Sequence, residues 1–130
     1  MTIERVNPPE LARPRGFSHA VVGTGTTVFL AGQTALDATG RIAGEDMVSQ
    51  FDQALANLLT ALTAAGGTPD QLAGLTIYVT DMDAYQAGAA AIGEVWRRRI
   101  GRAYPAMAAI GVSRLWDVEA MVELQATAVL

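Results

Sequence analysis

The stretch VSQFDQALANLLTALTAAGGTPDQLAGLTIYVT (48–80) decides the fold, because two hydrophobic periods follow one another within it. Apolar side chains first recur at intervals of three and four residues, which places them on one face of an α-helix: Val48, Phe51, Leu55, Leu58 and Leu62. The polar residues fall mostly away from that face: Gln50, Gln53, Asn57 and Thr60. Gly66 and Gly67 end the helix. Residues 75–80 then alternate apolar and polar side chains, which predicts a strand.

Upstream of this stretch, residues 18–33 read as a strand, a turn rich in glycine and threonine, and a second strand, which is the pattern of a β-hairpin. The first fifteen residues carry three prolines and are expected to be extended. Downstream, Asp81 or Asp83 can cap a second helix that runs to about Arg99.

The last third reads as two strands, 106–112 and 118–130. The longer one is sided: even-numbered apolar residues such as Val122 and Leu124 point one way, and Glu119, Met121, Glu123, Gln125 and Thr127 point the other. The element order β-β-α-β-α-β-β predicts an α+β protein, a mixed sheet with both helices on one face. An uncovered sheet face often meets a partner, so self-association is expected.

Composition excludes several classes of chemistry. With 130 residues, half of them apolar, the chain predicts one folded domain, 1–130. Cysteine and lysine are absent and His19 is the only histidine, which excludes thiolate and Schiff-base mechanisms and argues against a catalytic metal. A net charge of −4 argues against a nucleic-acid partner. Because we find no apolar run long enough for a signal peptide or a membrane span, we expect no membrane partner and a cytoplasmic location.

Five segments together resemble the RidA/YjgF (Rid) family, collinearly over nearly the whole chain: GFSHAV (16–21), VFLAGQTALDATGRIAG (28–44), QALANLLTALTAAGGTPDQLAGLTIYVTDMDAY (53–85), YPAMAAIGV (104–112) and VELQATAVL (122–130). The resemblance implies a chorismate-mutase-like fold that assembles as a homotrimer, with small-molecule pockets between subunits. It also implies hydrolysis of small imines and enamines, such as 2-aminoacrylate, without a cofactor.

The resemblance places the family's site residues one by one on this chain. Glu123 matches the carboxylate that positions or activates water. Ala31 and Gly32 belong to the AGQ block that contacts the substrate. Phe17 stands where a tyrosine is common, and Ala89 where an asparagine is often found. Ala109 is a further expected contact, on the same predicted strand as the P-A-M-A motif.

That motif contains the main departure, because Met107 replaces the arginine of the family's P-A-R-S sequence. The arginine clamps the substrate carboxylate, which methionine cannot do. Losing a contact to a charged group, worth ~1.5–3 kcal/mol or more, weakens binding of a carboxylate from about 10-fold to more than 100-fold. Arg114 is an alternative clamp, although its family position lies outside the pocket. For His19 a structural hydrogen bond is favoured over a catalytic role.

Three functions follow from these residues. The first is a divergent imine or enamine hydrolase whose substrate is not a standard amino-acid-derived carboxylate, with Glu123 handling water. The second is a non-catalytic small-molecule-binding or scaffold trimer. The third, a ribonuclease activity sometimes attributed to the family, is disfavoured because the acidic chain would repel a phosphate backbone.

Overall fold

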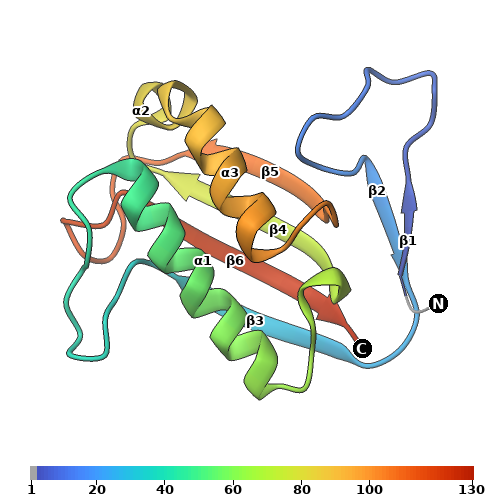
Figure 1. Ribbon diagram of the computed structural model, residues 1–130, viewed down its shortest axis with the longest axis horizontal. Coiled ribbons are helices and arrows are strands. Elements are labelled where there is room, and N and C mark those ends of the chain that lie inside the picture. Colours follow the sequence, from blue (N-terminus) through green and yellow to red (C-terminus); the bar gives the residue numbers. More distant parts are fainter. Residues whose placement is uncertain (1–2) are drawn as a thin grey trace.

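A four-stranded mixed sheet forms the centre of the computed structural model, which describes residues 3–130 (Figure 1). Its strand order is β3-β6-β4-β5, with β5 parallel to β4 and the other neighbours antiparallel. The strands are β3 (Thr27–Gln33), β4 (Leu72–Val79), β5 (Ala106–Gly111) and β6 (Val122–Val129). β3 and β5 are therefore the two edges, and the predicted mixed sheet is confirmed.

One face of this sheet is covered by helices, as expected: α1 (Met47–Ala64), α2 (Met82–Ala87) and α3 (Ala89–Arg99) (Figure 1). The apolar face of α1 buries Phe51, Leu55, Leu58 and Leu62 against the sheet. Burying each such side chain contributes ~1.5–3 kcal/mol, so this layer supplies much of the driving force for folding. No helix within residues 3–130 has the length and apolar character needed to cross a membrane.

α1 begins and ends where its sequence directs. The Asp46 side chain accepts a hydrogen bond from Ser49 N at 2.8 Å, and the Ser49 hydroxyl oxygen accepts one from the backbone N–H of Asp46 at 3.3 Å. These bonds satisfy two backbone donors that the first turn leaves free. At the other end Gly66 adopts a φ of +92°, the left-handed conformation that glycine tolerates best.

The predicted hairpin over residues 18–33 is wrong. β2 (Ala20–Gly23) pairs with β1 (Ile3–Val6) in a separate two-stranded sheet, whereas β3 pairs with β6. Between β2 and β3 the chain turns a corner at Gly25, where a Cβ atom would overlap the carbonyl oxygen of Leu130. Thr26 and Leu130 exchange two backbone hydrogen bonds there, so the close approach of the C-terminal residue fixes the corner.

The second predicted helix is two helices. Asp81 caps α2 through Ala84 N at 3.0 Å, and the helix stops at Gly88, from which α3 starts in a new direction. A Cβ atom at Gly88 would lie 3.0 Å from the Val48 side chain on α1, so the chain passes close to α1 at this break. A short 3₁₀ turn, η1 (Pro69–Gln71), leads into β4.

The sidedness predicted for the last strand is confirmed, although β6 begins at Val122 and not at residue 118. Val122 and Leu124 are fully buried beneath the helices, while Glu123, Gln125 and Thr127 lie on the other face. The sheet face opposite the helices is therefore uncovered within residues 3–130 of the chain.

Candidate functional site

A cavity of about 290 Å³ opens beside the edge strand β5, between the sheet and α3. Five apolar side chains in its lining are buried or half-buried: Phe51, Ile77, Ile92, Trp96 and Met107. The remaining lining residues are Arg15, Gly16, Tyr85, Ala89, Gly93, Arg97 and Tyr104. We call this the β5 cavity, and it contains two of the residues predicted from the sequence, Ala89 and Met107.

Met107 reaches this cavity because of its place in the sheet. It is in register with Leu75, which is 3% exposed, and it packs against the helix-covered core. Its neighbours Ala106 and Ala108 therefore lie on the uncovered face. Ala109, in register with the buried Ile77, is on the same side as Met107 but outside the cavity lining.

A clasp between the N-terminal loop and β5 brings Phe17 to the same edge of the sheet. Ser18 is buried, its N–H donates to Pro105 O at 3.0 Å and its hydroxyl donates to Tyr104 O at 2.7 Å. Phe17 packs edge-on against His19, with ring centroids 5.1 Å apart. The His19 Nε2 atom lies 2.7 Å from Ala12 O, in agreement with a structural role for the imidazole.

Glu123 lies elsewhere, on the uncovered face of β6. It is half-buried, and its carboxylate lies over the α-carbon of Gly32 on β3, so that a Cβ atom at residue 32 would overlap it. The β3–β6 pairing is irregular between Leu30 and Gln33. Ala31 lies within this irregular stretch and is exposed. Glycine at residue 32 therefore leaves the space that the Glu123 carboxylate occupies.

The predicted site residues thus form two groups in one chain. Phe17, Ala89 and Met107 lie near the β5 edge, and Ala31, Gly32 and Glu123 lie at β3 and β6. β4 and β6 separate the two edge strands. A single chain therefore does not bring Glu123 to Met107.

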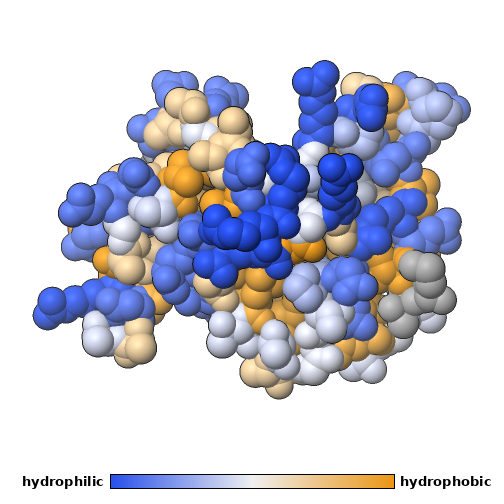
Figure 2. Space-filling view, viewed as in Figure 1, coloured by the Kyte–Doolittle hydropathy of each residue, from blue (hydrophilic) through white to orange (hydrophobic). Residues whose placement is uncertain are grey.

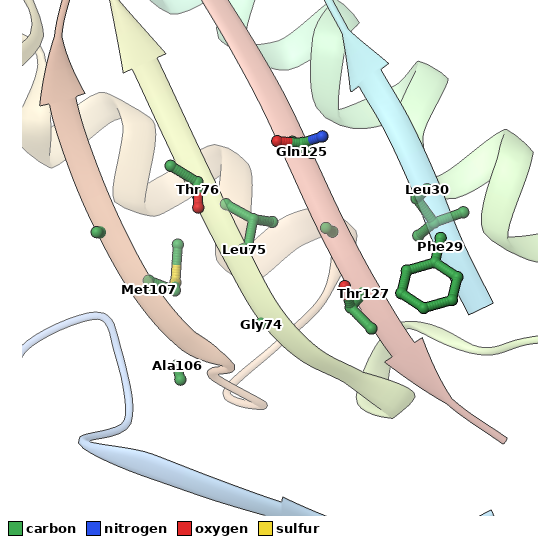
Figure 3. Close-up of a pocket in the computed structure, with 11 residues that line it drawn as sticks. Phe29, Leu30, Gly74, Leu75, Thr76, Ala106, Met107, Gln125 and Thr127 are labelled. Carbon is green, nitrogen blue, oxygen red and sulfur yellow. The ribbon is translucent and has the colours of Figure 1, made fainter. Parts of the chain in front are cut away.

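The uncovered face also carries a shallow groove of about 440 Å³ that runs across all four strands (Figure 3). Phe29 stands on β3 at one side of the groove with 82% of its surface exposed. Small or polar side chains complete the lining, among them Thr76, Ala106, Ala108, Gln125 and Thr127. An exposed phenylalanine in a flat groove of small residues is typical of a surface that another protein covers.

Arginines that were not predicted as site residues lie at and near the β5 cavity. Arg97 pairs with Glu94 at 2.7 Å, and the Glu94 carboxylate raises the pKa of Arg97. Arg98 and Arg99 both bind Asp52 of α1. Their placement was not visible in the sequence, where the run 97–99 is typical of any helix C-terminus.

Two further residues complete the electrostatic description. Burial raises the pKa of the Tyr85 hydroxyl, so it remains a hydrogen-bond donor in the cavity wall at neutral pH. Arg114 donates to the carbonyl oxygens of Leu115 and Trp116 in its own exposed loop, at 3.1 and 3.2 Å. Arg114 does not line the cavity beside Met107, which removes it as a replacement clamp within this chain.

Comparisons with known proteins agree with the fold and with the motifs. Residues 9–130 match the family model described as endoribonuclease L-PSP. A RutC family protein of Pyrococcus horikoshii is 32% identical over 117 residues, with 89% of each chain covered. The crystal structure of a Rid family protein of unknown function from Yersinia pestis has a TM-score of 0.90 at 37% identity, with both chains fully covered. RidA from an Antarctic Psychrobacter has a TM-score of 0.71 at 27% identity, covering 100% of this chain and 99% of the other.

Proposed function

The chain belongs to the Rid (RidA/YjgF) family, and from this premise we propose that it hydrolyses a small imine or enamine to a carbonyl compound and ammonia, without a cofactor. The observation that carries the proposal is the position of Glu123, whose carboxylate lies over Gly32 on the uncovered sheet face. The family assigns a water-activating carboxylate to this position, and the local backbone leaves room for it.

In the proposed reaction an enamine first gains a proton from solvent at carbon and becomes an iminium ion. Glu123 then accepts a proton from water while the water oxygen bonds to the iminium carbon and the C=N π electrons move to nitrogen, which gives a neutral carbinolamine. The same carboxyl group returns that proton to nitrogen, the C–N bond breaks with its electron pair leaving on ammonia, and the hydroxyl proton passes to solvent as the carbonyl forms. A positioned general acid and base of this kind contributes 10²- to 10⁴-fold to a rate.

The substrate differs from the family's α-carboxylate imines in this proposal, because Met107 stands where the clamping arginine is expected. The apolar surroundings of Met107 favour an apolar group next to the reacting carbon. A carboxylate bonded directly to that carbon would lose its solvation and gain no partner at residue 107.

The site requires more than one copy of the chain in this proposal, and the family implies a homotrimer. Two observations support the assembly. The β5 group and the Glu123 group lie toward opposite edges of the sheet, and the uncovered face exposes Phe29 in a groove of small residues. Packing the uncovered face of one copy against the β5 edge of the next would bring Glu123 toward Met107.

The test is ammonia release by the pure protein from imines generated in solution, comparing a neutral imine with 2-aminoacrylate. We expect turnover of the neutral imine to fall 10²- to 10⁴-fold in Glu123→Gln. Glu119→Gln is the matched control, since Glu119 is an exposed glutamate in the loop before β6. Equal rates in wild type and Glu123→Gln would contradict the proposal.

A second candidate is a binding protein without catalysis, and the replacement of the arginine by Met107 favours it. This alternative predicts that the wild-type protein binds ligands but releases no ammonia beyond the uncatalysed rate. It also predicts that Glu123→Gln leaves ligand affinity unchanged.

A further inference from the structure

The β5 cavity has a cationic rim above an apolar floor. Of its twelve lining residues only Arg15 and Arg97 are charged, and no lining residue is acidic. Figure 2 shows strongly hydrophilic surface gathered over α3 with apolar surface beside it. A cavity with this composition matches a ligand that has an apolar body and an anionic group.

Arg97 is available to such a ligand. Its guanidinium lies 3.5 Å from where a Cβ atom of Gly93 would be, so it extends back along α3 toward the cavity. Among the described residues it forms an ion pair with Glu94, and the two side chains are 46% and 74% exposed. An exposed pair three residues apart on a helix is weak, so an anion can compete for the guanidinium.

Arg15 is the second cation, and it comes from a different part of the chain. Within residues 3–130 its guanidinium makes no hydrogen bond or ion pair with another residue. Gly16, with a φ of +76°, turns the chain directly after it. The clasp at Ser18, three residues away, holds this loop against β5. The fold therefore holds the backbone at Arg15 beside the cavity, and the residue is part of the cavity lining.

Aromatic rings form part of the cavity wall. Trp96 is 4% exposed and belongs to this wall. The Tyr85 and Tyr104 side chains border the same space.

We propose that Arg15 and Arg97 bind the anionic group of the substrate, in place of an arginine at residue 107. The substrate is then an imine or enamine whose carboxylate is separated from the reacting carbon by an apolar segment that lies along Met107. This inference rests on the proposed function for the identity of the reacting group. The anion site itself rests only on the cavity.

The experiment measures binding alone, by calorimetric titration of the full chain with 4-phenylbutyrate and with its uncharged amide. We expect the carboxylate to bind at least 10-fold tighter than the amide. Arg15→Ala and Arg97→Ala should each lower the affinity for the carboxylate about 10-fold or more, which is the effect of losing a contact to a charged group. Neither variant should change the affinity for the amide. Arg102→Ala is the matched control, because Arg102 is exposed near α3 and does not line the cavity.

Equal affinities for acid and amide would overturn the inference, as would absence of binding by both probes. An equal loss of carboxylate affinity in Arg102→Ala would show that positive charge attracts the ligand in general, and this result would also overturn the inference. Thermal unfolding of each variant shows whether the fold is retained, and Arg97→Lys, which keeps the charge, should recover part of the affinity. If the carboxylate binds through both arginines but no imine is hydrolysed, the proposed function fails and the anion site stands.

Discussion

The carboxylate of Glu123 occupies the space above the α-carbon of Gly32 that a side chain at residue 32 would fill. Gly32→Ala should therefore displace the carboxylate while changing no charged group. Because the proposed general base is moved and not removed, we expect kcat to fall about 10- to 100-fold, less than for Glu123→Gln. Steady-state ammonia release measures this, and unchanged kcat would contradict the role assigned to the contact. Gly111→Ala is the control, since nothing lies within 4 Å of a Cβ atom there.

Introducing an arginine at residue 107 should move the preference toward α-carboxylates. Wild-type activity on 2-aminoacrylate is expected to be at least about 10-fold below that of an arginine-bearing relative, because Met107 cannot pair with a carboxylate. Met107→Arg should raise it, by about 10-fold at most, since Phe17 and Ala89 also depart from the family. Met107→Gln, which adds polarity without charge, should not. Equal activity in wild type and relative would show that residue 107 does not select the substrate.

Assembly should depend on the uncovered sheet face. In the proposed trimer, wild type sediments at about three times the chain mass of 13.6 kDa at micromolar concentration. Phe29→Glu places a charge on the residue that is 82% exposed there, and should give a monomer. Leu11→Glu, in the exposed N-terminal loop, should leave the assembly intact. A wild-type protein that sediments only as a monomer would exclude the trimer.

Gln50 should be the polar residue of α1 that matters most for stability. It is 2% exposed, its amide donates to Gly44 O and Glu119 O, and it accepts a hydrogen bond from Met121 N. Gln50→Leu leaves these backbone groups without partners and should lower the free energy of unfolding by ~1–3 kcal/mol. Urea unfolding measures the change. Gln86→Leu, at an exposed position, should change the free energy of unfolding by less than about 0.5 kcal/mol.

The cap of α1 should give the stability a dependence on acid pH. Hydrogen bonds from Ser49 hold the pKa of Asp46 below its ordinary value. A depressed pKa in the folded state means that the carboxylate stabilises the fold above the unfolded pKa, and that this contribution disappears as pH falls through the folded pKa. Asp46→Asn should therefore be less stable than wild type at pH 7 and nearly equal to it near pH 2. A difference that stays constant between these pH values would contradict the assignment.

Local periodicity predicted the elements that pack on one another in a regular way. The intervals of three and four residues located α1, and alternation placed Glu123 on the face opposite Leu124. The hairpin prediction failed because the partner of β3 is a strand almost one hundred residues later, and the close approach of Leu130 to Gly25 leaves no local signal. Gln50 was predicted to lie away from the core for a similar reason, since two of its hydrogen-bond partners, Glu119 and Met121, are distant in sequence.

The candidate site was predictable where it depends on motifs, and not where it depends on tertiary placement. Glu123, Gly32 and Met107 occupy motif positions, so the resemblance located them. Arg15 and Arg97 reach one cavity only because the Ser18 clasp and α3 meet there. Nothing in their sequence neighbourhoods distinguishes them from the other seven arginines.

The three consecutive arginines that end α3 make different contacts because they point in different directions around the helix axis. Successive side chains on a helix point about 100° apart, so Arg98 and Arg99 tie α3 to Asp52 of α1 while Arg97 turns toward the cavity. Inserting or deleting one residue in α3 would keep the charge and composition of this segment but rotate each arginine into another's place. The role of each arginine in this segment therefore depends on its position along the helix, which net charge and residue counts do not record.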